Sequence, residues 1–294
     1  MKRAMIMGVL NVTPDSFYDG GFYFDRNKAI EHGLELIEEG ADIIDVGGES
    51  TRPGAEPVSV GEELRRVLPV IEALSPLTRI SIDTFKEKVA EEAVAAGADM
   101  INDVGGNLTD TAAALNSALV IMHKQGSYHN MQAKPYYEDV VREVYSDLIS
   151  RALAAAKRNI SEIYIDPGIG FGKTADHNLT LLGFLPFLIR DNAKFPLLVG
   201  VSRKRFLGHI LAEDKKPDRF NIEEYDLMPD NADEYEQLSS KLRLDFAQDA
   251  PVPPAERKEA SLAAASFMIL AGVKIVRVHD VAETKYIADL MGDI

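Results

Sequence analysis

Residues 27–46 read NKAIEHGLELIEEGADIIDV, which places a helix, a stop and a strand in direct succession. Apolar side chains recur at helical spacing over Asn27–Glu39, and Gly40 follows where a left-handed helix cap is expected. Asp42–Val46 is then a short apolar run of strand length. The same order of helix, glycine and strand recurs around Gly97. A repeated unit of this kind predicts parallel strands joined by right-handed crossovers.

Eight strand-like runs occur in the chain, and helical patterns of ten or more residues separate most of them. The predicted strands are Ala4–Leu10, Asp42–Val46, Arg79–Asp83, Met100–Asp103, Ala118–Met122, Glu162–Asp166, Leu197–Val201 and Val273–Val278. The predicted helices include Asn27–Glu39, Glu62–Leu74, Lys86–Ala96, Glu138–Asn159 and Ser261–Ala271. Eight such units close a parallel sheet into a barrel, so we expect one α/β domain, a (β/α)8 TIM barrel over residues 1–294. An open doubly wound sheet has the same alternation and remains the alternative.

One segment interrupts the repeat. Glu213–Ala250 holds 12 acidic and 5 basic residues and several turn-forming sequences, so we expect it to be mostly loop. Its composition cannot supply an independent core, which indicates an insertion within the seventh βα unit and argues against a second domain. We expect its deletion to spare whatever chemistry the barrel performs.

Composition excludes several classes of protein. The chain of 294 residues has no cysteine, which excludes a disulfide scaffold, a thiolate zinc site and a cysteine nucleophile. Its formal net charge of −15 argues against a nucleic-acid partner, because phosphate backbones require basic surfaces. No run is long and apolar enough for a membrane span, and the first residues do not form a secretion signal. We therefore expect a soluble, cytoplasmic protein.

Polar or charged residues follow or end every one of the eight apolar runs. They are Asn11, Gly48–Arg52, Asp83, Asn102-Asp103, His123, Asp166, Ser202–Lys204 and His279-Asp280. In a parallel barrel these positions form one ring at the carboxyl ends of the strands, where active sites of this architecture lie. Taken singly, Asp83 also fits a helix cap and Asp166 a turn. All eight together predict a polar pocket.

The charges of this ring divide into two groups. Hydrogen-bond acceptors that suit a flat heterocycle with several N–H donors are Asp83, Asn102 and Asp166. Groups that suit a phosphate, gathered behind the seventh and eighth strands, are Ser202, Arg203, Lys204, Arg277 and His279.

Three common motifs are absent or incomplete. Gly168–Thr174 ends like a phosphate-binding loop, but Pro167 stands where the first glycine of that motif is required. The histidines show no zinc-ligand spacing on one helix face, and no Gly-x-Ser-x-Gly nucleophile elbow is present. We therefore reject a nucleotide-binding loop, a zinc site and a serine hydrolase.

Two long segments resemble the signatures of a known family. Asn11–Gly21 reads NVTPDSFYDGG and Asp45–Gly54 reads DVGGESTRPG, and both closely resemble the signature segments of bacterial dihydropteroate synthases. Shorter matches follow in family order at Ile82–Thr84, Ile101–Asp103, Asp166–Gly172, Val201–Lys204 and Arg277–Asp280. The resemblance implies a (β/α)8 barrel that joins 6-hydroxymethyl-7,8-dihydropterin diphosphate to 4-aminobenzoate. The products would be 7,8-dihydropteroate and pyrophosphate, on the route to folate.

The resemblance also implies roles for individual residues. Pterin-binding residues would be Asp83, Asn102, Met122, Asp166, Phe171, Lys204 and Arg277, of which Asp83, Asp166, Lys204 and Arg277 would be catalytic. The diphosphate would contact Asn11, Arg277 and His279, with Asn11 also holding Mg²⁺. The aminobenzoate site, where sulfonamide drugs compete, would comprise Phe17, Thr51, Arg52, Pro53 and Ser202. The loops Thr13–Gly21 and Ser50–Gly54 would close over the site, and the protein would be a homodimer.

Other functions remain open at this point. A pterin-binding methyltransferase shares the barrel and passes a methyl group to a corrinoid partner, but it has no use for a diphosphate site. A non-catalytic pterin-binding relative would be expected to lose loop residues that this chain retains, and a drug-insensitive synthase is a third alternative. The chain departs from the family pattern in the acidic insertion and in Pro254–Ser261 after it, which puts the dimer geometry in doubt.

Overall fold

The computed structural model describes residues 3–13, 26–50, 56–126, 131, 135–191, 194–212 and 252–292. The predicted insertion at 213–250 lies outside these residues, although the described chain on both sides of it belongs to the segment between the seventh and eighth strands.

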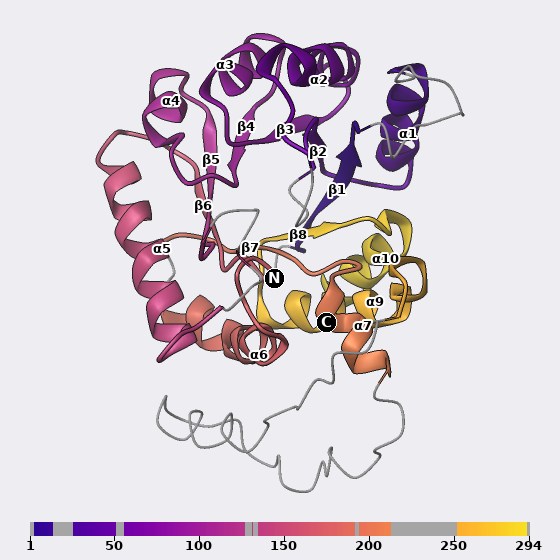
Figure 1. Cartoon of the computed structure of the whole chain (residues 1–294). Helices are drawn as coiled ribbons and strands as arrows, with labels where there is room; N and C mark the ends of the chain where they lie inside the picture. Colours follow the sequence, from indigo (N-terminus) through magenta and orange to yellow (C-terminus); the bar gives the residue numbers. More distant parts are fainter. Residues whose placement is uncertain are drawn as a thin grey trace, which may run out of the picture.

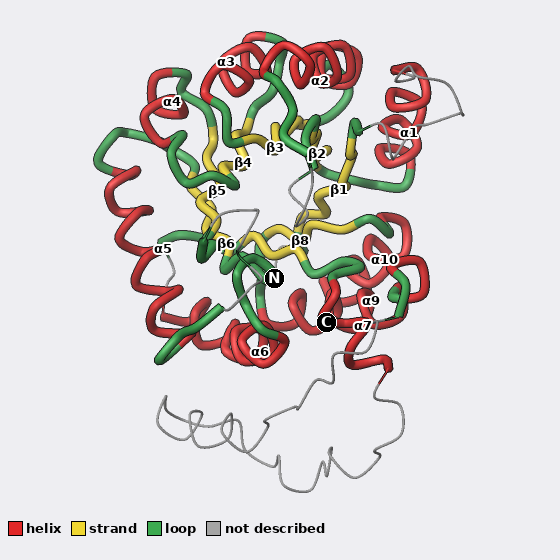
Figure 2. The backbone as a smooth tube through the Cα atoms, in the orientation of Figure 1, coloured by secondary structure: helices red, strands yellow, loops and turns green. Residues whose placement is uncertain are grey.

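Eight parallel strands form one sheet in the order β6-β5-β4-β3-β2-β1-β8-β7. They are β1 (Met5–Asn11), β2 (Ile43–Gly47), β3 (Arg79–Thr84), β4 (Met100–Asp103), β5 (Ala118–Met122), β6 (Ile163–Asp166), β7 (Leu198–Gly200) and β8 (Ile275–Val278). A parallel bridge between Ile165 and Leu197 joins the two outer strands, and the Ile165 amide donates to the Pro196 carbonyl at 3.1 Å. The predicted barrel is therefore confirmed, and an open sheet is excluded (Figure 2).

Helices surround the ring of strands on its outer side (Figure 1). They are α1 (Arg26–Glu38), α2 (Val60–Leu74), α3 (Glu87–Ala95), α4 (Thr109–Ala114), α5 (Val140–Ala156), α6 (Ala175–Asp191), α7 (Arg205–Ala212), α9 (Lys258–Ala271) and α10 (Val281–Gly292), with a 3₁₀ turn, η3, at Pro254–Glu256. Gly40, Gly97 and Gly272 have φ values of 100°, 114° and 96°, so the predicted left-handed stops after helices are confirmed. Within the described residues, no helix has the length and apolar character needed to cross a membrane.

Apolar side chains fill both faces of the sheet. One large cluster packs the strands against the helices, and a smaller one lies inside the barrel. The interior cluster is Met7, Ile43, Met100, Ala118, Val120, Tyr164, Leu198 and Ile275. Because side chains two residues apart share a strand face, Ile43 lies one layer from Asp45, and Met100 one layer from Asn102. The apolar layer is therefore the floor on which the polar strand ends rest.

Candidate active site

Strand register brings the predicted ring together at the carboxyl end of the barrel. Asn11 pairs with Gly47, Gly47 with Asp83, and Asp83 with Asn102. Gly47 has no side chain, and a Cβ there would lie 3.6 Å from Asp83 Cβ and 3.9 Å from Asn11 Oδ1. The missing side chain leaves room between the Asn11 amide and the Asp83 carboxylate.

The other half of the ring follows the same rule. Buried Met122 pairs with Asp166 at the ends of β5 and β6, and Gly200 pairs with Arg277 on β7 and β8.

Arg277 bridges two carboxylates across the barrel. Its Nε donates to Asp45 Oδ2 at 2.6 Å, and its Nη2 donates to Asp83 Oδ2 at 2.9 Å. Asn102 Nδ2 donates to the same Asp45 oxygen at 3.2 Å. The pattern of the sequence alone predicts no role for Asp45. Asp45 is a carboxylate in a strand that is buried on both faces. Because a buried charge requires a partner, this position could have indicated a role in the site.

The Asp83 carboxyl is poised to change charge near neutral pH. Burial is the main cause that raises its pKa to about 7, and the negative charge of Asp45 adds to the effect while Arg277 opposes it. Asp83 Oδ1 and Asp45 Oδ1 are buried and have no hydrogen-bond partner in the described structure. Buried acceptors of this kind are rare in folded proteins, so these two oxygens are suited to receive donors from a ligand.

Asp166 and Lys204 carry opposite charges on the neighbouring side of the ring, and each charge acts on the pKa of the other. Burial raises the pKa of Asp166 and lowers that of Lys204 to about 8, and each charge opposes the effect of burial on the other. Asp166 Oδ1 accepts from the Gly168 amide at 2.7 Å. Lys204 Nζ donates to the Ile169 carbonyl and lies 4.9 Å from the centroid of the half-buried Phe171 ring. The aromatic ring and the two charges thus share one corner of the site.

The turn after β7 contacts the end of β8. Ser202 Oγ accepts from the His279 amide at 3.2 Å and lies 3.0 Å from His279 Nδ1. Arg203 has a φ of 58° and pairs with Asp280 at 2.6 Å. The predicted basic groups are therefore adjacent, and Asp280 pairs with Arg203 as Asp45 and Asp83 pair with Arg277.

Two residues after the insertion hold this turn, and the sequence did not reveal their role. Arg257 Nη1 donates to the Arg203 carbonyl at 2.9 Å, and its Nε donates to the Val252 carbonyl at 2.6 Å. Ser261 Oγ accepts from the Arg203 amide at 2.9 Å. The segment that departs from the family pattern therefore supports the strained turn between Ser202 and Lys204.

A partly buried ion-pair network ties together the two chain ends that flank residues 51–55. Lys86 Nζ lies 2.6 Å from Glu49 Oε2 and 2.6 Å from Glu63 Oε2, and it donates to the Val58 carbonyl at 2.5 Å. The Val58 amide also donates to Glu49 Oε1 at 3.0 Å. The predicted aminobenzoate residues Phe17, Thr51, Arg52 and Pro53 lie outside the described residues, as does most of both predicted loops.

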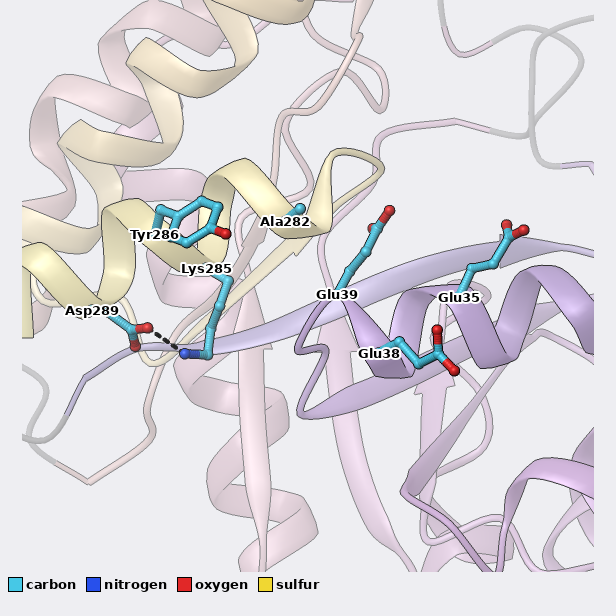
Figure 3. Close-up of a pocket in the computed structure, with 7 residues that line it drawn as sticks. All are labelled: Glu35, Glu38, Glu39, Ala282, Lys285, Tyr286 and Asp289. Carbon is cyan, nitrogen blue, oxygen red and sulfur yellow. Dashed lines mark hydrogen bonds and ion pairs between the residues drawn. The ribbon is translucent and has the colours of Figure 1, made fainter.

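A surface hollow elsewhere is unsuited to the predicted substrates. It lies between α1 and α10 and is lined by Glu35, Glu38, Glu39, Ala282, Lys285, Tyr286 and Asp289 (Figure 3). Glu39 precedes the turn into β2, so the hollow lies towards the amino ends of the strands. Lys285, the cation among these residues, is paired with Asp289, and the remaining carboxylates would repel a diphosphate.

Comparisons with known proteins agree with this geometry. A model of the pterin binding enzyme family matches residues 7–279. Dihydropteroate synthase of Bacillus subtilis is 38% identical over 99% of this chain and 88% of its own length. Two solved dihydropteroate synthases share the fold. That of Xanthomonas albilineans with 4-aminobenzoic acid is 40% identical, with a TM-score of 0.77 over 98% of this chain and 92% of its own. That of Burkholderia cenocepacia complexed with 7,8-dihydropteroate is 37% identical, with a TM-score of 0.78 over 100% of this chain and 92% of its own.

These matches cover nearly the whole chain and decide against the methyltransferase and non-catalytic alternatives. The chain belongs to the pterin-binding enzymes and, among them, to the dihydropteroate synthases.

Proposed function

We propose that this chain condenses 6-hydroxymethyl-7,8-dihydropterin diphosphate with 4-aminobenzoate, giving 7,8-dihydropteroate and pyrophosphate for folate synthesis. Membership of the family supports the reaction. The observation that carries the assignment to this site is the arrangement around Arg277, where buried acceptor oxygens without partners lie beside a partly buried cation. The acceptors suit the N–H groups of a pterin, and the cations suit its departing diphosphate.

In this proposal the pterin lies across the ring of strand ends. Asp83, Asn102 and Asp166 accept from its N–H groups, while Met122 and Phe171 line the faces of its ring. Lys204, whose ammonium lies over the Phe171 ring and whose pKa responds to the charge of Asp166, contacts the ring system from the side of β7.

The reaction depends on stabilisation of the pterin cation and of the departing diphosphate more than on a general base. The methylene carbon on an electron-rich dihydropterin carries positive charge well, so the bond from carbon to the diphosphate oxygen breaks with both electrons leaving on the diphosphate. Carboxylates at the ring favour the cation, and Arg277, His279 and Asn11 stabilise the departing group. The aminobenzoate nitrogen then attacks the carbon and loses a proton. An arylamine is already nucleophilic, so no strong general base is required, and closed loops would keep water from capturing the cation.

The aminobenzoate would bind beside the β7 turn, at Ser202. Phe17, Thr51, Arg52 and Pro53 would complete that site, in keeping with the resemblance of both signature segments to those of the family.

A magnesium ion fits the residues present. Mg²⁺ commonly takes one or two protein oxygens and completes its shell with waters and substrate phosphates. Asn11 Oδ1 at the carboxyl end of β1 is such an oxygen, and no group of three His, Asp or Glu side chains suited to a metal occurs in the described ranges. Asn11 would hold the ion, which would neutralise charge on the diphosphate when bound.

The protein is also proposed to act in the cytoplasm as a homodimer. Exposed apolar side chains on the packed pair α9 and α10 support association, since Leu270, Tyr286 and Leu290 are 61%, 76% and 62% exposed. Sedimentation of the purified protein tests the oligomeric state.

The direct test of the function measures pyrophosphate release from the pterin diphosphate, with and without 4-aminobenzoate. Release that depends on 4-aminobenzoate and is matched by pteroate formation is the expected result. Absence of release with both substrates and Mg²⁺ present would refute the proposal.

A further inference from the structure

Lys173 is a buried lysine that the proposed chemistry does not use, and burial lowers its pKa to about 7 while the charge of Asp166 opposes this effect. It lies in the loop between β6 and α6 and is 3% exposed. Its Nζ donates to the carbonyls of Gly168 and Phe171, both at 3.1 Å, and lies 3.0 Å from His123 Nδ1. An ammonium has three N–H donors, so these three partners satisfy it. The resemblance to a phosphate-binding loop is therefore misleading, because this lysine binds its own loop.

The same short loop forms one wall of the proposed pterin site. Gly168 and Gly170 have φ values of 64° and 84°, so the chain turns sharply on both sides of Ile169. The Ile169 carbonyl accepts from Lys204, and the Phe171 ring lies beside the Lys204 ammonium. Lys173 and Lys204 thus bind successive carbonyls of one loop, and the first lysine fixes the backbone that the second contacts.

The loop also packs against the chain that follows β5. A Cβ at Gly168 would lie 1.8 Å from the His123 carbonyl oxygen, and the Tyr137 hydroxyl donates to the Gly172 carbonyl at 3.0 Å. Burial lowers the pKa of His123 to about 3, with Lys173 adding to the effect. The imidazole is therefore neutral at physiological pH, and its Nδ1 can accept from Lys173.

When protonated, Lys173 also acts on Asp166 through its charge. Burial raises the pKa of Asp166, and Lys173 is among the groups that oppose this rise, together with Lys204 and the Gly168 amide. Loss of the Lys173 charge would therefore favour the protonated form of Asp166.

We infer that Lys173 is a positioning residue for pterin binding, which sets the wall formed by Gly168–Phe171 and the placement of Lys204 without contacting the substrate. This inference rests on the proposed function, because it specifies which substrate loses affinity when the lysine is removed. A residue needed only for folding would affect both substrates alike.

The test compares Lys173→Met, Lys173→Gln and the control Lys88→Met, whose lysine is exposed on α3. Calorimetric titration with 6-hydroxymethyl-7,8-dihydropterin diphosphate, without 4-aminobenzoate and with Mg²⁺, gives the pterin Kd. Steady-state pyrophosphate release gives KM for 4-aminobenzoate, and thermal melting reports folding. For Lys173→Met we expect a pterin Kd weaker by about tenfold or more, because the loss of one charged hydrogen bond to a misplaced Asp166 or Lys204 is worth about tenfold.

The 4-aminobenzoate KM of Lys173→Met should stay within about twofold of wild type, because the lysine lies on the pterin side. Lys173→Gln keeps N–H donors and should regain part of the affinity, while Lys88→Met should match wild type. A folded Lys173→Met with wild-type pterin affinity, or with both substrates weakened equally, would overturn the inference. If Lys173→Met does not fold, the pterin Kd of Lys173→Gln tests the inference instead. A wild-type pterin Kd in Lys173→Gln would then overturn it. Failure of the wild-type protein to bind the pterin would instead count against the proposed function.

Discussion

Replacing Asp45 by Asn removes one negative charge from the carboxylates around Arg277 and keeps the size of the side chain. Asp45 and Asp83 share Arg277, so the three groups carry one excess negative charge when Asp83 is ionised. Burial is the main reason that the pKa of Asp83 is about 7, and the Asp45 charge is the next. A close like charge in a buried site is worth on the order of one pKa unit, or about 1.4 kcal/mol. Asp45→Asn should therefore bring the Asp83 transition to about pH 6.

Pterin affinity measured against pH reports this change. An ionised Asp83 accepts hydrogen bonds from the pterin, so affinity should rise as pH increases through the folded-state pKa of Asp83. In wild type the rise should centre on about pH 7, and in Asp45→Asn it should occur at lower pH. Stability moves in the opposite direction. Because folding raises this pKa, the contribution of Asp83 to stability is greatest below its ordinary value and declines as pH rises towards 7. The variant should show a smaller decline.

The same variant should lose only about 1–2 kcal/mol of stability, the value of a charged hydrogen bond. Breaking a buried ion pair usually costs roughly 3–5 kcal/mol, but here Arg277 keeps Asp83 as a partner. Asp42→Asn is the matched control, because Asp42 pairs with Arg3 at 2.7 Å just before β2, at the other end of the barrel. A midpoint that stays at the wild-type pH in Asp45→Asn, or that moves equally in the control, would refute this reasoning.

Three further predictions concern other parts of the chain. Asp83→Asn should remain folded by thermal melting and reduce pyrophosphate release by roughly 100-fold or more, and near-normal release would remove Asp83 from its proposed role. Gly168→Ala should lose at least about 1–3 kcal/mol in chemical denaturation, because its φ is positive and its Cβ would meet the His123 carbonyl; wild-type stability would contradict the described loop. Deletion of residues 213–250 should leave turnover within about twofold of wild type, and a folded but inactive deletion variant would show that the insertion takes part in the reaction.

The fold could be predicted because its signals are local. Helical periodicity, glycine stops and short apolar runs each depend on neighbouring residues, and they located all eight strands. Predicted strand ends differ by up to two residues, as for Val273–Val278 against the observed Ile275–Val278. There the Lys274 and Ile275 amides both donate to the Leu197 carbonyl, a contact that depends on the pairing of β8 with the distant β7 segment.

The ring of site residues was also predictable, because strand ends in a parallel barrel must meet. The partners within the ring were not. Asp45 and Arg277 are 232 positions apart, and their bond depends on register across β8, β1 and β2. Lys173 was considered only as part of an incomplete motif. Its burial depends on a left-handed loop packed against the chain after β5, and no periodicity in the sequence expresses that contact.

The contact between β6 and β7 would link pterin binding to the stability of the barrel. One bridge joins these strands in the described structure, whereas every other pair of neighbouring strands shares at least three residue pairs in register. Asp166 ends β6 and Lys204 follows β7, so the proposed pterin position spans this contact. A pterin bound to both side chains would stabilise the contact between β6 and β7, which has the fewest paired residues of the neighbouring strands. Bound pterin would then protect backbone amides in β6 and β7 from hydrogen exchange. Part of its binding free energy would appear as a higher free energy of unfolding of the barrel.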